Sequence, residues 1–172
     1  MVRVLIPTTA EQLDQVRALM RAFIAWHRQR HQQDLALIDS YFDAAGFEME
    51  LAGLPGKYAP PRGQLLLALV GDQPAGCVAL REVDPTRCEM KRMFVYPDQQ
   101  GQGIGRALAE GVIRDACTMG YKSMLLDTSI RQPEAQALYR RLGFRNIEPY
   151  YDLPVALRNW LVFMELPLQA RT

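Results

Sequence analysis

The chain has 172 residues, of which 49% are hydrophobic and 23% are charged. A chain of this length can bury a sizeable core without a metal or a disulfide, so we expect a single domain over residues 1–172. The formal net charge of +1 gives no overall attraction to nucleic acid or to an anionic membrane. No run approaches the roughly 18 apolar residues of a membrane span, so neither kind of partner is expected.

The three cysteines, Cys77, Cys88 and Cys117, form no C-x-x-C pair and have apolar neighbours. This pattern is typical of reduced thiols rather than of a disulfide framework. The N-terminal apolar run has no cleavage-like site and leads directly into a helix cap. We therefore predict a cytoplasmic protein.

The first third of the chain predicts one strand followed by helices. Residues 2–6 have the character of a strand, and Thr8 or Thr9 can cap a helix that extends to Arg28. A second, more broken helical region spans residues 35–51 and contains Gly46. The Pro/Gly-rich residues 53–63 resemble a linker, but they are too few to separate two domains.

The remaining chain alternates strands and helices. Strands are expected at residues 64–70, 75–83, 88–96, 122–129 and 160–168, helices at 104–119 and 133–142, and one more short strand at 145–148. The order is β-α-α-β-β-β-α-β-α-β, with antiparallel hairpins first and strand–helix–strand crossovers later. It predicts an α/β (α+β) fold with a mixed central sheet of six to seven strands flanked by about four helices.

The segment "VYPDQQGQGIGRALAEGVI", residues 95–113, joins a strand to an amphipathic helix through Gly101, Gly103 and Gly105. Unpaired N–H groups and the helix dipole favour an anion at such a junction. Glycine lets the backbone approach a ligand and adopt positive φ. The segment therefore predicts a binding site for a phosphate-bearing ligand.

Two common phosphate motifs do not match this loop. A Walker A loop requires Lys followed by Ser or Thr after its last glycine, where this chain has Arg106 and Ala107. A dinucleotide fingerprint, G-x-G-x-x-G, fails because its third glycine position falls on Arg106 or Leu108. Asp127 is placed like the acidic residue of that fingerprint, but the chain does not open with a βαβ unit.

Two other motifs match in detail. "QGQGIG" fits [R/Q]-x-x-G-x-[G/A], and "AQALYRRLGF", residues 135–144, fits A-x-x-L-Y-x-x-x-G-F. With both motifs in this order, the chain resembles the GNAT N-acetyltransferase superfamily from about Gln64 to Phe144. The resemblance implies the GNAT fold and a loop that holds the pyrophosphate of acetyl-CoA, with no metal.

The resemblance also assigns cofactor contacts. The main chain at the end of the strand before the loop would bind the pantetheine arm, as an added strand does at an open sheet edge. The contacts implied are Met93, Phe94, Val95, Gln100, Gly101, Gln102, Gly103, Ile104, Gly105, Arg106, Asp127 and Gln132. Gln132 stands where many members of the superfamily have asparagine.

The same resemblance assigns two catalytic residues. Tyr139 would protonate the leaving thiolate, although it also lies on an apolar helix stripe and can be a core tyrosine. Glu89 would act through water as the base that deprotonates the amine. The alternative for Glu89 is a strand residue paired with Lys91 or Arg81.

His27 and His31 have the i, i+4 spacing of a helical metal pair, but no third ligand accompanies them. We expect a solvated helix end at these two residues rather than a metal site.

The acceptor is less defined by the sequence. Arg81, Arg92 and Arg158 could clamp a carboxylate, and Tyr58, Tyr150 and Tyr151 could shape a pocket. We expect acetyl transfer to a primary amine of a small, amino-acid-like molecule by direct attack in a ternary complex. Acetylation of a protein N-terminus or lysine, and a non-catalytic acyl-CoA-binding module, are the alternatives, and the sequence leaves a homodimer open.

Overall fold

The computed structural model describes residues 1–169, which form seven strands and six α-helices. The strands are β1 (Val2–Leu5), β2 (Gln64–Val70), β3 (Gln73–Asp84), β4 (Arg87–Val95), β5 (Ser123–Ser129), β6 (Arg145–Ile147) and β7 (Leu161–Pro167). The helices are α1 (Ala10–Arg30), α2 (Leu35–Phe42), α3 (Ala44–Ala52), α4 (Ile104–Thr118), α5 (Pro133–Arg141) and α6 (Val155–Trp160). None of these helices is long and apolar enough to cross a membrane.

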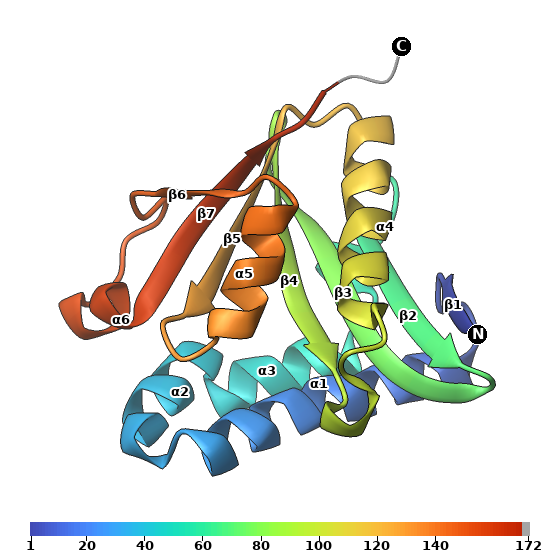
Figure 1. Cartoon of the computed structure of the whole chain (residues 1–172), viewed down its shortest axis with the longest axis horizontal. Helices are drawn as coiled ribbons and strands as arrows, with labels where there is room; N and C mark the ends of the chain where they lie inside the picture. The colour runs from blue at the N-terminus through green and yellow to red at the C-terminus, as the bar shows by residue number, and fades with distance from the viewer. Residues whose placement is uncertain (170–172) are drawn as a thin grey trace.

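One sheet carries all seven strands in the order β1-β2-β3-β4-β5-β7-β6. Every neighbouring pair is antiparallel except β4 and β5, which run parallel because α4 connects them as a crossover. The predicted mixed sheet is therefore confirmed. Figure 1 shows the two halves of the sheet separating toward α1, with β4 on one side of the gap and β5 on the other.

Helices cover both faces of the sheet. Leu65, Leu67 and Leu69 of β2 pack in a core with α1, α2, α3 and α6, whereas Leu66 and Ala68 pack in the core on the other face, under α4. The side chains of a strand alternate between faces, so a strand buried on both sides needs the continuous apolar run seen in "QLLLALV". The sequence of β2 is thus explained by its place between two helical layers.

The helix count is higher than the approximately four predicted, for two reasons. The broken helical region is two helices, and the break falls at Asp43, which has φ 35°, rather than at Gly46, which lies inside α3. The short helix α6 was not predicted. Only Leu157 and Trp160 of its six residues are buried, which is too few to produce a readable helical period.

The start of α1 follows its sequence signature. Thr9 accepts a hydrogen bond from the backbone N–H of Gln12, whose side chain in turn accepts from the backbone of Thr9. This capping box satisfies two of the N–H groups that a helix leaves unpaired at its N-terminus. The helix continues two residues beyond the predicted Arg28, to Arg30.

Candidate active site

The sheet opens between β4 and β5. The two strands pair only from Arg87 to Glu89 on β4, which lie opposite residues 123–125 of β5, and then diverge. One cause is a bulge in β4, where Arg92 has φ 58° and the register with β3 shifts by one residue. A bulge bends its strand and increases the local twist. Beyond Glu89, the edge of β4 that faces β5 is therefore left without a partner strand.

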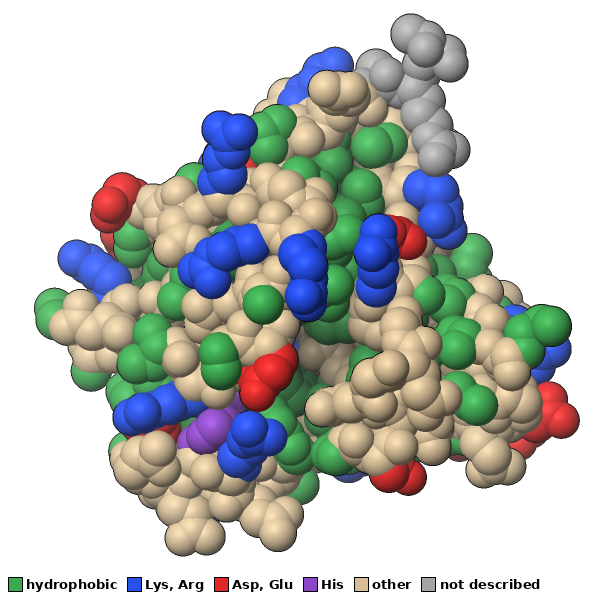
Figure 2. Space-filling view, in the orientation of Figure 1, with side chains coloured by type: hydrophobic (Ala, Val, Ile, Leu, Met, Phe, Trp, Pro, Cys, Tyr) green, Lys and Arg blue, Asp and Glu red, His purple; other side chains and the backbone are tan. Residues whose placement is uncertain are grey.

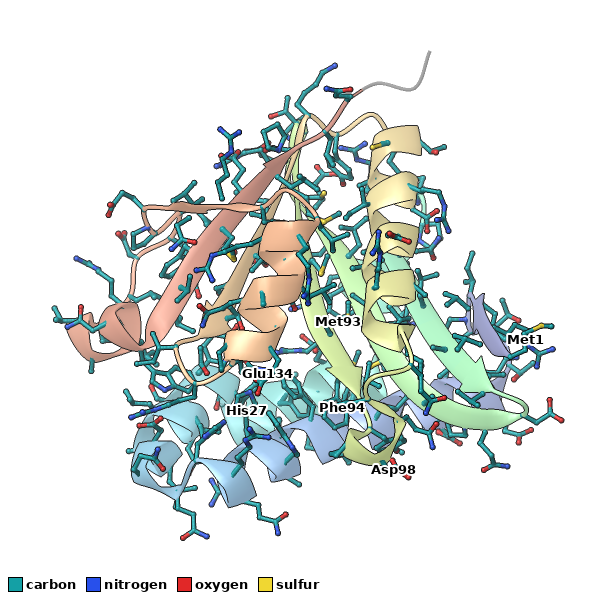
Figure 3. The ribbon with its side chains drawn as sticks, viewed as in Figure 1. Met1, His27, Met93, Phe94, Asp98 and Glu134 are labelled. Atoms are coloured by element: carbon teal, nitrogen blue, oxygen red, sulfur yellow. The ribbon has the colours of Figure 1, made fainter. Side chains whose placement is uncertain are left out.

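A groove of about 660 Å³ occupies this opening. Met93, Phe94 and Val95, the predicted pantetheine contacts, form one wall of it. Figure 3 shows Met93 and Phe94 at the end of β4, between α5 and the loop before α4, with α1 below them. The free strand edge thus faces the groove, as a ligand that mimics an added strand requires.

The glycine loop closes one end of the groove. Gly101 and Gly103 have φ of 80° and 79°, a region that favours glycine, and Gly103 is the N-cap of α4. The first N–H groups of α4 have no partner within the helix and point toward the groove end, where the helix dipole is positive. Gln100, Gly101, Gly103, Ile104, Gly105 and Arg106 all line the groove. The loop therefore offers main-chain donors to an anion.

Three polar side chains at the loop and the start of α4 have partners within this segment or next to it. Gln102 lies outside the groove lining, and its amide donates to Gln99. Gln100 lines the groove and donates to the carbonyl of Val95 at 3.3 Å. Arg106 is largely exposed and pairs with Glu110 at 2.7 Å. A phosphate contact from Arg106 would require this surface pair to open, at small energetic cost.

Sequence reasoning missed the part of the lining that comes from α1 and α5. Phe23, Trp26 and Arg30 of α1 line the groove, as do Leu138 and Arg141 of α5. Figure 2 shows Lys and Arg side chains gathered around a hollow that has hydrophobic side chains at its edge. A helical stripe predicts that such residues face inward, but not which cavity they face.

A second, smaller cavity of about 50 Å³ adjoins the groove. Four residues line both: Phe23, Met93, Gln132 and Tyr139. Its other walls come from α1, α2, β4, β5 and α6 and include His27, Tyr41, Lys91, Asp127 and Trp160. The arrangement joins a long groove to a small chamber at the side chain of Tyr139.

Tyr139 is held by α5, with its ring edge-on to Phe144 and only 6% of its surface exposed. Burial raises the pKa of Tyr139, and the nearby negative charge of Asp127 adds to the shift. The hydroxyl therefore stays protonated at neutral pH. It is available as a hydrogen-bond donor at the junction of the groove and the chamber.

Gln132, at the N-cap position of α5, uses its carbonyl oxygen locally. Oε1 accepts from the hydroxyl of Thr128 at 3.0 Å and from the backbone N–H of Ser129 at 3.4 Å. Gln132 also lines both the groove and the chamber.

Asp127 lines the chamber and not the groove, although it was predicted as a cofactor contact. It lies on β5, with one carboxylate oxygen 2.5 Å from the hydroxyl of Tyr41 and the other 2.5 Å from that of Tyr151. Its contact with the cofactor stays a prediction.

Glu89 is buried beside the chamber but does not line it. One of its oxygens accepts from Nε of Arg81 at 2.7 Å, and the other accepts from the hydroxyl of Tyr150. Its nearest link to the chamber is Lys91, whose Nζ lies 3.9 Å from Oε1. Its role as a base stays a prediction, because catalytic geometry often tightens only when substrate binds.

The sequence model of the acetyltransferase (GNAT) family matches residues 36–144. The chain belongs to this family. The match covers β2 to α5, and so contains the bulged strand, the glycine loop and Tyr139, and it confirms the resemblance read from the two motifs.

This GNAT is similar to curated proteins and to solved structures, among them the following two relatives and one structure. An uncharacterized N-acetyltransferase of Schizosaccharomyces pombe is 37% identical over 128 residues, which are 69% of this chain and 78% of the relative. The N-acetylaspartate synthetase of Danio rerio is 34% identical over 76% of this chain and 47% of its own length. The PaiA N-acetyltransferase of Thermoplasma acidophilum, solved in complex with coenzyme A, shares the fold with a TM-score of 0.72 at 14% identity, over 97% of this chain and 99% of that one.

The histidine pair of this GNAT differs from the prediction. His27 is 2% exposed and His31 is 6% exposed, so the expected solvated helix end is wrong. Burial, with a smaller contribution from the adjacent His31, lowers the pKa of His27 to about 4. Within residues 1–169, no group of three or more His, Cys, Asp or Glu side chains could hold a metal ion. His27 is thus a neutral wall of the chamber, and its Nδ1 has no hydrogen-bond partner among the described residues.

The predicted acceptor residues fall in different places. Arg92 lines the chamber, but it is paired with Glu50 at 2.9 Å, and Arg81 is paired with Glu89. Arg158 is exposed on α6, and Tyr58 is buried in the core. Tyr151 is connected to the chamber through Asp127. The three arginines therefore do not form a common clamp in this structure.

Proposed function

We propose that this GNAT transfers the acetyl group of acetyl-CoA to a primary amine of a small molecule, by direct attack within a ternary complex. The observation that carries the proposal is the junction at Tyr139, where the groove meets the chamber. The groove takes the pantetheine arm along Met93–Val95 and the pyrophosphate at Gly101–Arg106. The thioester then lies at Tyr139, and the amine approaches from the chamber.

Tyr139 is proposed to stabilise the leaving group. As the amine nitrogen bonds to the carbonyl carbon and the C–S bond breaks, the sulfur takes up negative charge. A thiol has a pKa of about 8.5, and burial raises the pKa of Tyr139 above its usual value. Full proton transfer from the phenol is therefore uphill, but a hydrogen bond to the sulfur stabilises the thiolate as it forms. The proton lost by the amine can then neutralise it.

Glu89 remains the proposed base. An amine is protonated at neutral pH and must lose a proton before it attacks. Glu89 is followed in β4 by Met90 and Lys91, which both line the chamber. Its carboxylate contacts the ammonium of Lys91. Water in the chamber would carry the proton from the amine to Glu89.

The size of the chamber favours a small acceptor. A volume of about 50 Å³ corresponds to roughly four water-sized spheres, enough for an amine-bearing end but not for a long basic side chain with its surroundings. The relative named N-acetylaspartate synthetase supports an amino-acid-like amine. The cytoplasmic location, supported by the unpaired thiols of Cys77 and Cys88, and a homodimer are further predictions.

The test is release of free CoA thiol from acetyl-CoA, measured over amino acids, polyamines, aminoglycosides and short peptides. We expect turnover with small amines and little or none with peptides. Turnover only with peptides would replace the small molecule with a protein acceptor. Silence across the panel, from protein that still binds acetyl-CoA, would indicate a non-catalytic binding module.

A further inference from the structure

The chamber contains two opposite charges joined by a single hydroxyl group. Tyr41 donates to Oδ1 of Asp127 at 2.5 Å, and the ammonium of Lys91 lies 3.2 Å from the same hydroxyl. All three side chains line the chamber, although they come from α2, β4 and β5. The carboxylate of Asp127 and the ammonium of Lys91 are therefore separated by the Tyr41 hydroxyl alone.

Asp127 is the only carboxylate in the described lining of the chamber. Both of its hydrogen-bond donors, Tyr41 and Tyr151, are neutral hydroxyls, so they orient the carboxylate without cancelling its charge. A carboxylate has about four lone-pair sites, and these two bonds occupy two of them. Asp127 can therefore accept further hydrogen bonds from a cation in the chamber.

Lys91 is the cation of the chamber whose charge is least compensated. Arg92 is held by two contacts with Glu50, at 2.9 and 3.2 Å, and His27 is neutral. The carboxylate nearest to Lys91 is Glu89, at 3.9 Å, and Glu89 is already paired with Arg81 at 2.7 Å. An ammonium has three donors, so Lys91 can still bind an anion.

An α-amino acid carries an ammonium and a carboxylate on the same carbon atom. Resting on the proposed function, we propose that the acceptor is an α-amino acid zwitterion, held with its ammonium on Asp127 and its carboxylate on Lys91. Asp127 and Tyr139 line the same small chamber, and Tyr139 also lines the groove, so this orientation places the amine near the thioester. The small volume admits the zwitterionic head, and the side chain of the amino acid extends toward the rim.

The test compares matched acceptors by CoA thiol release: the best α-amino acid of the panel, its methyl ester, and the amine that lacks the carboxylate. We expect kcat/KM to be at least about 100-fold lower for the ester and the amine, the cost of an unpaired buried charge. Lys91→Met should reduce this preference to less than about 10-fold. Lys122→Met, which changes an exposed lysine immediately before β5, should preserve it.

Asp127→Asn should raise KM for every amine by about 10-fold or more while CoA affinity stays unchanged, and Asp72→Asn in the exposed β2–β3 turn is its control. Equal turnover of the acid, the ester and the amine would overturn the zwitterion site and leave the acetyltransferase intact. Retention of the full preference in Lys91→Met would also overturn it. Absence of turnover with every amine would overturn the proposed function, and this inference with it.

Discussion

The guanidinium of Arg92 and the carboxylate of Glu50 face each other at 2.9 Å, and the side chain of each is only 11% exposed. This pair ties the bulge of β4 to α3. It lowers the pKa of Glu50 to about 2, against the opposing effect of burial, and Lys57 adds a second cation at 2.8 Å. The bulge that opens the sheet therefore has a buried electrostatic support.

Glu50→Gln should destabilise the protein by about 3 kcal/mol or more, because it leaves the charge of Arg92 buried without its partner. Urea unfolding at neutral pH measures the loss. Glu48→Gln is the matched control, because Glu48 lies on α3 like Glu50 but forms an exposed pair with Arg21. This variant should leave the urea midpoint unchanged. Equal midpoints for the two variants would show that the Arg92 pair does not support the bulge.

Gly103→Ala should weaken CoA binding by 10-fold or more. The residue has φ 79° and caps α4, so a Cβ strains the backbone by roughly 1–2 kcal/mol and disturbs the N–H groups that face the groove. Gly71→Ala introduces the same kind of strain in the β2–β3 turn, where φ is 61°. Isothermal titration with CoA should separate the two: similar losses of affinity would mean that the loop does not bind the pyrophosphate.

The features that could be predicted from the sequence are local in the chain. The Thr9 cap, the apolar run of β2 and the glycines before α4 each depend on neighbouring residues, and so do the two family motifs. The contacts in and beside the chamber are not local. Tyr41 and Asp127 are 86 residues apart, and Tyr150 and Glu89 are 61 apart. No periodicity in a single sequence indicates such pairs.

The same distinction explains where the structure differs from what the sequence suggests. The resemblance implies a cofactor contact for Asp127, and the structure places this residue in the lining of the chamber. His27 was taken for a helix end in solvent, but Phe23, Phe42 and Trp160 pack around it. In both cases the tertiary arrangement of other segments decides the environment.

Stability should fall with acid as His27 is forced to take a proton. The unfolded state binds this proton near pH 6.5 and the native state only near pH 4, so unfolding takes up the proton between these values. The contribution of His27 to the free energy of unfolding is fully present above pH 6.5 and declines by up to about 3 kcal/mol toward pH 4. His27→Phe should show a shallower decline in urea unfolding over this range. Identical pH profiles would show that His27 is not buried as a neutral ring.

Glu89→Gln tests the proposed base. If Glu89 deprotonates the amine, turnover should fall about 10- to 100-fold at pH 7 and recover as the pH approaches the pKa of the acceptor amine. Tyr150→Phe, which removes the hydrogen bond to Glu89 but keeps the carboxylate, is the matched variant and should lose less. A deficit that is the same at every pH would assign Glu89 a positioning role, through Arg81 and Lys91.

The most direct measurement is the turnover of Tyr139→Phe, with CoA affinity determined on the same preparation. Removal of one hydroxyl where the groove meets the chamber should lower kcat about 10- to 1000-fold and leave the Kd for CoA nearly unchanged, because the hydroxyl acts on the leaving sulfur and not on the bound cofactor. Unchanged turnover would remove Tyr139 from the chemistry and contradict the proposed arrangement of thioester and amine.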